Sequence, residues 1–135
     1  MAFRPLNWNE GHVLLVPAAN STTFTKGNAL TYSSGLLTNA ASGTAVDVYF
    51  VTAKTVTTTV SGQLIEVWPT VNVVYEADCD AAWATANQGT LADLASVSTV
   101  NADASTNDLF LIYYGIGATG VGTKVVGRFM HANET

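Results

Sequence analysis

Two carboxylates flank the only cysteine of this sequence, in the run Asp78, Cys79 and Asp80. A thiol between two carboxylates could bind a metal ion or act as a nucleophile. Calcium and magnesium sites need more oxygen ligands than this run provides, and no histidine follows at the spacing that zinc sites use. Asp80 is also well placed to cap a helix. We therefore predict a structural role for these residues, with no bound metal and no cofactor.

The two histidines, His12 and His131, lie at opposite ends of the chain, and each could serve a serine or Cys79 as a general base. Neither is paired locally with an acid, and the sequence has none of the short motifs of serine hydrolases, zinc proteases or nucleotide hydrolases. A hydrolase would have to assemble its triad from distant residues. We predict that the chain is not an enzyme.

The acidic residues are scattered along the chain rather than paired. Two carboxylates on either side of a glycosidic bond can hydrolyse it, but here such a pair could arise only through tertiary proximity. Acidic side chains are mostly solvated at the surface of a protein, which is the ordinary interpretation. The residues considered are Asp47, Glu66, Asp93, Asp103 and Asp108.

A glycine-rich run from Gly115 to Gly120 matches the G-x-G-x-x-G pattern of dinucleotide-binding loops and follows an expected strand. That kind of site needs a helix that begins at the motif and an acidic residue about 20 positions later. The residues that follow, 121–126, have the character of a strand instead. We interpret the run as the turn of a β-hairpin.

Trp68 and Trp83 could provide stacking platforms for a sugar. Each has apolar neighbours in the sequence, and large aromatic side chains contribute most when they are buried in a core or an interface. Burial is therefore the favoured interpretation for both.

Short β-branched and aromatic runs, separated by Gly, Ser, Asn and Pro, position all of these residues and predict an all-β fold. One short helix is expected over about 80–87, from Asp80 to a stop before Gly89, and Thr55–Ser61 is expected to be a loop. A sandwich and a small barrel give the same alternation, so both stay open. The clearest strands are expected at Ala45–Ala53, Gln63–Trp68, Val71–Glu76, Leu109–Tyr114 and Lys124–Met130, and weaker ones at His12–Val16, Ala29–Tyr32 and Leu36–Asn39.

Alternation along two of these strands predicts which side chains are buried. In Gln63–Trp68, Ile65 and Val67 share a face that we expect to point inward. In Leu109–Tyr114 both faces are apolar, as expected for a central strand or for one whose outer face is covered by another subunit. Pro69 cannot donate to a ladder, so pairing should break or bulge there, or run along an edge.

The first residues, 1–11, show no sustained period and are expected to form an arm that precedes a β-rich domain over 12–135. The arm carries the large apolar side chains Phe3, Leu6 and Trp8. Exposed aromatic groups on a flexible segment are unfavourable, so we expect them to dock either on their own domain or on a partner.

The composition is 48% hydrophobic and only 11% charged, with a formal net charge of -5, whereas charged residues make up roughly a quarter of an ordinary domain. A surface with so few charges suits a protein that packs against neighbours. The five Lys and Arg residues are dispersed, which argues against nucleic acid or a membrane surface as a partner.

One cysteine allows no internal disulfide, and we expect no signal peptide and therefore synthesis in the cytoplasm.

A series of segments between about Lys26 and Met130 carries a family resemblance. Its members, in order, are KGNAL at Lys26–Leu30, Gly35–Leu37, DVYFVTA from Asp47, Gly62 leading into QLIEVWP, VVYEAD at Val73–Asp78, an Ala-rich piece ending at Gly89, Leu94–Asn101, and the closing pair Asp108–Phe110 and Val125–Phe129. In residue type and spacing, this series resembles the small head decoration, or cement, proteins of tailed bacteriophages.

The resemblance implies a β-rich structural protein of the virion that is commonly a homotrimer. Such a protein binds the major capsid protein on the outer surface of the expanded shell and stabilises it against the pressure of the internal DNA. The resemblance also implies that an N-terminal arm reaches the capsid lattice or a neighbouring subunit. In this sequence the arm residues expected to make those contacts are Phe3, Arg4, Leu6 and Trp8.

A second function remains open from the sequence. A lectin-like β-domain displayed on a virion or cell surface would bind host glycans, and exposure of Trp68 or Trp83 on a concave face would favour this function. The third alternative is a small hydrolase, which would need His12 or His131 close to both a serine and a carboxylate.

Overall fold

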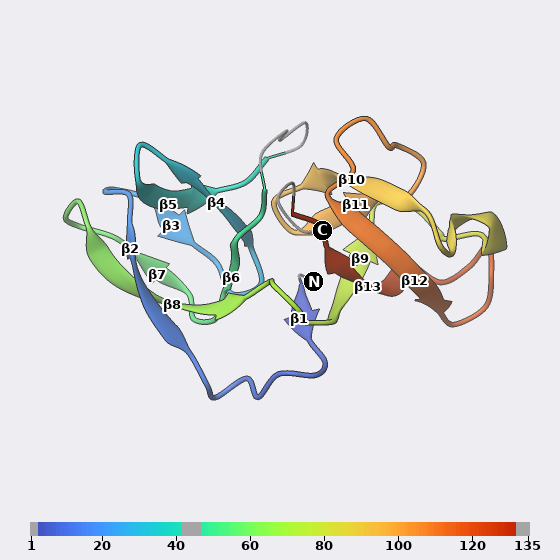
Figure 1. Cartoon of the computed structure of the whole chain (residues 1–135), viewed down its shortest axis with the longest axis horizontal. Helices are drawn as coiled ribbons and strands as arrows, with labels where there is room; N and C mark the ends of the chain where they lie inside the picture. The colour runs from blue at the N-terminus through green and yellow to red at the C-terminus, as the bar shows by residue number, and fades with distance from the viewer. Residues whose placement is uncertain (1–2, 42–46, 132–135) are drawn as a thin grey trace.

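The computed structural model describes residues 3–41 and 47–131, and within these ranges the regular elements are almost all β-strands (Figure 1). The predicted all-β fold is confirmed. In chain order the elements are β1 (Arg4–Pro5), β2 (Leu14–Ala18), β3 (Thr23–Phe24), β4 (Ala29–Ser33), β5 (Leu36–Asn39), β6 (Phe50–Thr52), β7 (Val56–Thr57), β8 (Gln63–Pro69), β9 (Tyr75–Cys79), the 3-10 helix η1 (Thr85–Asn87), β10 (Leu91–Ser96), β11 (Thr99–Asn101), β12 (Phe110–Ile116) and β13 (Lys124–Phe129).

Five strands close into a small barrel in the order β2, β5, β4, β6 and β8. We call this half of the molecule, on the left of Figure 1, the barrel lobe. Its core includes Leu30, Leu37, Ile65 and Val67. Burial of Ile65 and Val67 confirms the inward face that alternation predicts for β8, while Leu64 on the opposite face is exposed. The short ribbon of β3 and β7 adds Phe24 to the same core.

The other half, which we call the sheet lobe, is a six-stranded sheet that closes on itself. β9 pairs with both β11 and β13, and β10 and β12 complete the circuit, while β1 flanks β9. Its core packs Phe3, Tyr75, Phe110 and Phe129 in four ring pairs whose centroids lie between 4.8 and 6.0 Å apart. Of the two architectures that the sequence left open, small barrels describe this molecule better than a sandwich.

Residues from both lobes share one continuous core. Trp68 lies on β8 of the barrel lobe, yet its side chain belongs to the larger core cluster that fills the sheet lobe. Two backbone hydrogen bonds also cross between the lobes, from the Phe3 amide to the Gly27 carbonyl at 3.1 Å and from the Ala29 amide to the Val97 carbonyl at 2.8 Å. The two lobes therefore form one packed body.

Strand pairing stops at Pro69, as its missing amide predicts. The next strand begins at Tyr75 rather than at Val71, because the intervening residues make a turn in which Asn72 has a φ of 59°. β6 covers only Phe50–Thr52 of the strand expected over Ala45–Ala53, and residues 45 and 46 lie outside the described ranges.

The helix expected over 80–87 is wrong for most of its length, since only Thr85–Asn87 are helical. The backbone of the preceding residues is used in contacts between distant segments. The Asp80 amide donates to the Val100 carbonyl at 3.0 Å, and the Trp83 amide donates to the Gly122 carbonyl at 3.0 Å. These long-range bonds, together with burial of Trp83, outweigh the helix propensity of the alanines.

The Thr55–Ser61 segment is a loop except for the two-residue strand β7. A buried side chain anchors the loop: the Thr58 hydroxyl donates to the Ala19 carbonyl at 2.6 Å and accepts the Thr22 amide at 3.1 Å. The threonine-rich sequence thus supplies both a short strand and an internal hydrogen-bonding anchor.

Candidate functional site

The glycine-rich run at 115–120 lies at the hairpin between β12 and β13, as predicted. Two glycines of this hairpin make room for the indole ring of Trp83. A Cβ atom at Gly115 would collide with that ring, and one at Gly122 would collide with the Ile116 carbonyl. The Trp83 Nε1 donates to the Ile116 carbonyl at 2.9 Å. The role of Gly115 and Gly122 in this structure is to leave space for the packed Trp83 ring.

The carboxylate of Asp78 is held by a lysine rather than arranged for metal binding. Lys124 Nζ lies 2.6 Å from Asp78 Oδ1 and 3.7 Å from Glu76 Oε1, and Arg4 binds the other oxygen of Glu76 at 3.2 Å. The result is an ion-pair network across β1, β9 and β13. Within the described ranges, no group of three or more metal-binding side chains lies together.

Burial, and after it the charges of the nearby carboxylates, that of Asp80 first, together raise the pKa of the Cys79 thiol to about 11. A thiol with such a pKa is almost entirely protonated at neutral pH, whereas the thiolate is the nucleophilic form. Cys79 is also buried at the end of β9. It behaves as a small core residue.

The two histidines lie in different surroundings. His12 is exposed, and its ring lies edge-to-face with the Trp8 ring, with the two ring centroids 5.2 Å apart. His131 Nε2 lies 2.9 Å from the Thr70 hydroxyl and 3.0 Å from the Val48 carbonyl. This nitrogen is therefore directed at a threonine and a backbone carbonyl, and it joins the end of the described chain to the segment before β6.

Asp93 is the acidic residue with the clearest structural role. It is buried on β10, and its carboxylate accepts hydrogen bonds from three successive amides, those of Thr106, Asn107 and Asp108, at 3.0, 2.7 and 2.9 Å. One carboxylate thereby fixes the loop that leads into β12.

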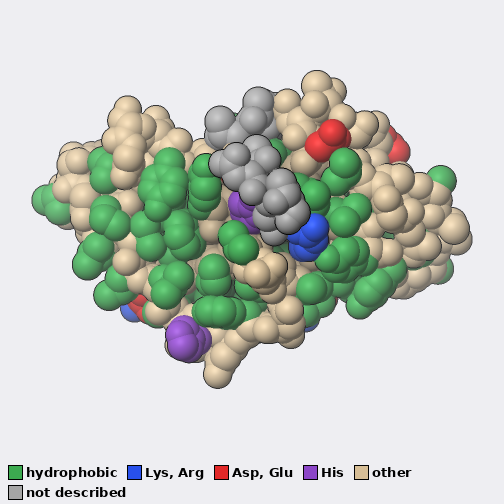
Figure 2. Space-filling view, in the orientation of Figure 1, with side chains coloured by type: hydrophobic (Ala, Val, Ile, Leu, Met, Phe, Trp, Pro, Cys, Tyr) green, Lys and Arg blue, Asp and Glu red, His purple; other side chains and the backbone are tan. Residues whose placement is uncertain are grey.

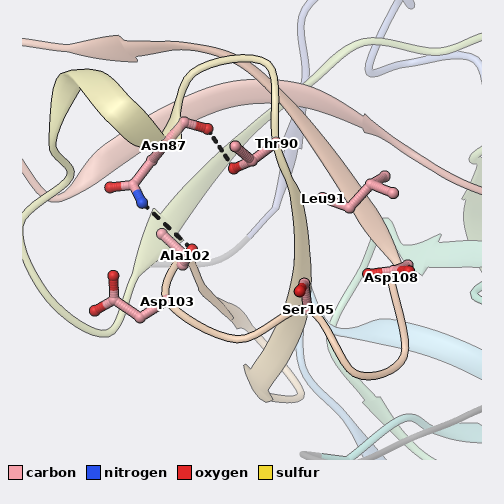
Figure 3. Close-up of a pocket in the computed structure, with 7 residues that line it drawn as sticks. All are labelled: Asn87, Thr90, Leu91, Ala102, Asp103, Ser105 and Asp108. Atoms are coloured by element: carbon pink, nitrogen blue, oxygen red, sulfur yellow. Dashed lines mark hydrogen bonds between the residues drawn. The ribbon is translucent and has the colours of Figure 1, made fainter.

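Asp103 and Asp108 line one open cavity of about 470 Å³ beside β10. Figure 3 shows the two carboxylates at opposite ends of it, with Ser105 between them in this view, so they do not form a close pair. The hydrogen bonds drawn there tie the wall of the cavity together, from the Thr90 hydroxyl to the Asn87 carbonyl at 2.6 Å and from the Asn87 amide group to the Ala102 carbonyl at 3.4 Å. The lining residues are Asn87, Thr90, Leu91, Ala102, Asp103, Ser105 and Asp108.

Both tryptophans considered as sugar platforms are buried. Trp68 and Trp83 are 1% and 6% exposed, and each indole nitrogen is bound, the first to the Glu10 carbonyl at 2.9 Å. Core packing, the interpretation favoured from the sequence, is confirmed for both.

The described part of the N-terminal arm docks on its own domain. Phe3 is buried in the sheet-lobe core, and Arg4 and Pro5 pair with β9 as β1. The Leu6 amide donates to the Val74 carbonyl at 2.8 Å, and the Trp8 Nε1 donates to the His12 carbonyl at 2.8 Å. Of the four residues expected to contact a capsid or a subunit, Arg4 and Leu6 have exposed side chains, Trp8 is half-buried and Phe3 is enclosed.

An exposed apolar surface lies on the outer face of the β2 and β8 pair. It consists of Leu15, Pro17 and Leu64, and we call it the Leu15 face. Leu15 is 60% exposed and Leu64 is 55% exposed, and Pro17 pairs with Leu64 across the two strands. Its charged border is the Lys54 and Glu66 ion pair, at 3.7 Å.

A second group of exposed apolar residues is aromatic. Tyr32 and Tyr49 pack against each other at 5.1 Å on the barrel lobe, and Tyr113 and Tyr114 are exposed on β12. β12 is a central strand, paired with β10 and β13. Of its two apolar faces, the inner one is buried in the core and the outer one is left uncovered. Figure 2 shows hydrophobic side chains gathered over both lobes of one side of the molecule, with few charged groups among them.

The Leu15 face was not among the surfaces expected from the sequence. Its signal was present, because two consecutive leucines at 14 and 15 on a strand cannot both point inward. The exposed face becomes apparent only once the partner of β2 is known to be β8, which brings Leu64 beside it.

Comparison with known proteins finds no matching protein family, no matching curated protein and no matching solved structure. None of the helices in the described ranges is both long and apolar enough to cross a membrane.

Proposed function

We propose that this protein is a non-enzymatic structural component of a virion that binds the outer surface of the expanded capsid of a tailed bacteriophage. It binds the major capsid protein as a homotrimer and stabilises the shell against the pressure of the packaged DNA. The observation that carries the proposal in the structure is the Leu15 face, an exposed apolar surface on the paired strands β2 and β8.

Exposed apolar surface of this kind marks a site of association with another macromolecule. Leu15 and Leu64 would each lose their contact with water on binding, at a gain of roughly 25 cal/mol for each Å² of apolar area that is buried. The low proportion of charged residues, 11%, keeps the cost of removing the surrounding surface from water small.

The proposed mechanism is thermodynamic linkage. A protein that binds only the expanded lattice lowers the free energy of that lattice by RT ln(1 + [L]/Kd) for each site. A symmetric trimer that contacts several capsid subunits multiplies a weak individual contact into strong overall binding. Tight binding by each subunit alone is not required.

Exposure of Trp68 or Trp83 would favour the alternative function, glycan binding, but both side chains are buried. We therefore prefer the decoration function to the lectin-like one.

Co-sedimentation with capsid shells tests the proposal. The purified protein is mixed with unexpanded and with expanded shells that lack it, and the pelleted amount is measured as a function of concentration. We expect saturable pelleting with expanded shells alone. Absence of pelleting with either form would overturn the proposal, and a glycan array would then be the next experiment.

A further inference from the structure

Strand β2 is paired along its whole length on one side only. It runs antiparallel to β8 from Leu14 to Ala18, but on its other side it pairs with β5 at Ala18 alone. Figure 1 shows the rest of β2 extending beyond the end of β5. The part of β2 before Ala18 is therefore an edge of the barrel lobe.

The pairing pattern identifies the backbone groups that point outward from this edge. The Ala53 amide donates to the Glu66 carbonyl at 2.9 Å, so the backbone groups of Glu66 point toward β6. Leu15 lies directly opposite Glu66 in the β2 and β8 register. In an antiparallel ladder this makes the two a non-hydrogen-bonded pair, and both backbone groups of Leu15 point away from β8.

The neighbouring residues follow the same alternation. Ala19, four residues after Leu15, uses its outward amide to donate to the Leu37 carbonyl at 2.9 Å. Pro17, two residues after Leu15, also points outward and has no amide to donate. Among the described residues, no backbone group pairs with the amide or the carbonyl of Leu15. Leu15 thus presents one open donor and one open acceptor.

The side chains beside this edge do little to prevent strand addition. Natural proteins protect an edge with charged side chains, bulges, prolines or a covering loop. Here Pro17 protects one end, but Leu15 is exposed and Leu64 continues the apolar surface on β8. An exposed apolar edge of this kind is a template for another strand.

We propose that this edge of β2 receives an extended segment of the capsid protein, which adds to the barrel lobe as a further antiparallel or parallel strand. The inference rests on the proposed function and specifies how the partner binds. The segment has apolar residues at alternate positions that cover the Leu15 face, it pairs with Leu15, and it leaves the edge at Pro17 because that residue offers no donor.

The same edge fits a second copy of this chain less well. Two copies related by a two-fold axis through Leu15 would each place an acceptor opposite the missing amide of Pro17, so the defect would occur twice. A stable pair of free proteins also needs about 800 Å² of contact from each partner, and the Leu15 face provides only three side chains. A segment of a shell that is held by further contacts does not need that area.

Hydrogen exchange at single-amide resolution tests this inference on the unmodified protein. The Leu15 amide should exchange rapidly in the free protein and slow by on the order of tenfold or more when the protein is bound to expanded shells. The Val16 amide is an internal control, since Val16 pairs with Ile65 in the β2 and β8 ladder and should be protected in both states.

A pair of variants separates the backbone contact from the side-chain contact. Leu15→Ala removes the leucine side chain and keeps the amide, whereas Leu15→Pro removes the amide as well, at an edge position where proline is tolerated. We expect L15P to bind expanded shells about tenfold more weakly than L15A, the order expected for one hydrogen bond. Thermal unfolding of both variants checks that they fold. If L15P does not fold, the exchange experiment on the unmodified protein still tests the inference.

The outcomes distinguish the two proposals. Absence of shell binding by the unmodified protein overturns the proposed function and this inference with it. Saturable binding with an unprotected Leu15 amide, or with L15P equal to L15A, overturns strand addition alone. If the Leu15 amide of the free protein exchanges more slowly as the protein concentration rises, the edge pairs with a second copy of this chain. That result would also overturn the inference.

Discussion

The indole ring of Trp83 lies against Gly115, at the place where any other residue would carry its Cβ atom. The two residues are 32 positions apart by their numbers. Their contact fixes the hairpin of β12 and β13 against the segment that precedes η1. This contact also explains why the segment around Trp83 packs along the hairpin instead of forming a helix.

We expect Gly115→Ala to destabilise the protein by about 3 kcal/mol, because the added methyl group overlaps a buried ring that cannot move away freely. The measurement is urea-induced unfolding followed by tryptophan fluorescence. Gly11→Ala is the control, since a Cβ atom there has the Asn9 side-chain oxygen as its nearest contact, at 3.3 Å. A destabilisation by G115A no larger than that of G11A would contradict the packing argument.

Asp93→Ala should destabilise the protein by about 3 kcal/mol, because it leaves three amides of the loop at 106–108 without their acceptor. Asp93→Asn keeps one acceptor oxygen and should lower the free energy of unfolding by less than Asp93→Ala does. Asp103→Asn, on an exposed side chain, is the matched control and should change the free energy of unfolding by about 0.5 kcal/mol or less. Equal unfolding free energies for D93A and D103N would refute a structural role for Asp93.

The fold class follows from local patterns, but the boundaries of several elements do not. Alternation correctly predicts the buried face of β8 at Ile65 and Val67, and Pro69 correctly predicts where that strand ends. The helix expected from Asp80 is wrong because its backbone makes bonds to Val100 and Gly122. Such bonds join residues far apart in sequence, so no local signal contains them.

The candidate surface was harder to predict than the core. Burial of Trp68 and Trp83 is favoured by their sequence context, whereas exposure of Leu15 and Leu64 depends on which strands pair. The docking of Phe3 was open between its own domain and a partner, and only the tertiary structure places it in the core. Sequence patterns determine which side chains share a face, but strand pairing determines which face remains in water.

The ion pair between Asp78 and Lys124 predicts a stability that depends on pH. Burial alone would raise the pKa of the Asp78 carboxyl, but the hydrogen bond from Lys124 and the charge of Lys124 both lower it, and the net shift is downward. The pKa of Lys124 is raised, mainly by the same hydrogen bond. Asp78 therefore contributes stability that is present above its unfolded pKa of about 3.9 and is lost as the pH falls through its lower folded value.

Lys124→Met should destabilise the protein at pH 7 by about 1 kcal/mol, a small value because the Lys124 side chain is 42% exposed. The difference from the unmodified protein should shrink below about pH 4 as Asp78 is protonated. It should shrink again as the pH rises above about 10.4, the ordinary pKa of lysine, and passes through the higher folded pKa of Lys124. Unfolding free energies measured across this range check the result. Lys54→Met, which removes a more exposed lysine from a longer ion pair, should show no such dependence.

The Cys79 thiol should react slowly with a disulfide reagent at pH 8, because its pKa is about 11 and its side chain is buried. The same thiol should react at the rate of an ordinary cysteine in urea, where both causes are removed. The labelling rate is measured by absorbance in the two conditions. Rapid labelling of the folded protein would mean that β9 opens or that the thiol is accessible.

Leu64→Glu tests whether the Leu15 face binds the shell. A carboxylate at the centre of an apolar contact loses its hydration without gaining a partner, so we expect binding to expanded shells to weaken by about tenfold or more. Val121→Glu is the matched control, because it adds the same charge at a residue that is 74% exposed on the β12 and β13 hairpin. Both variants should unfold at the temperature of the unmodified protein. Equal losses in the two variants would indicate a general effect of charge, and unchanged binding by L64E would place the contact elsewhere on the molecule.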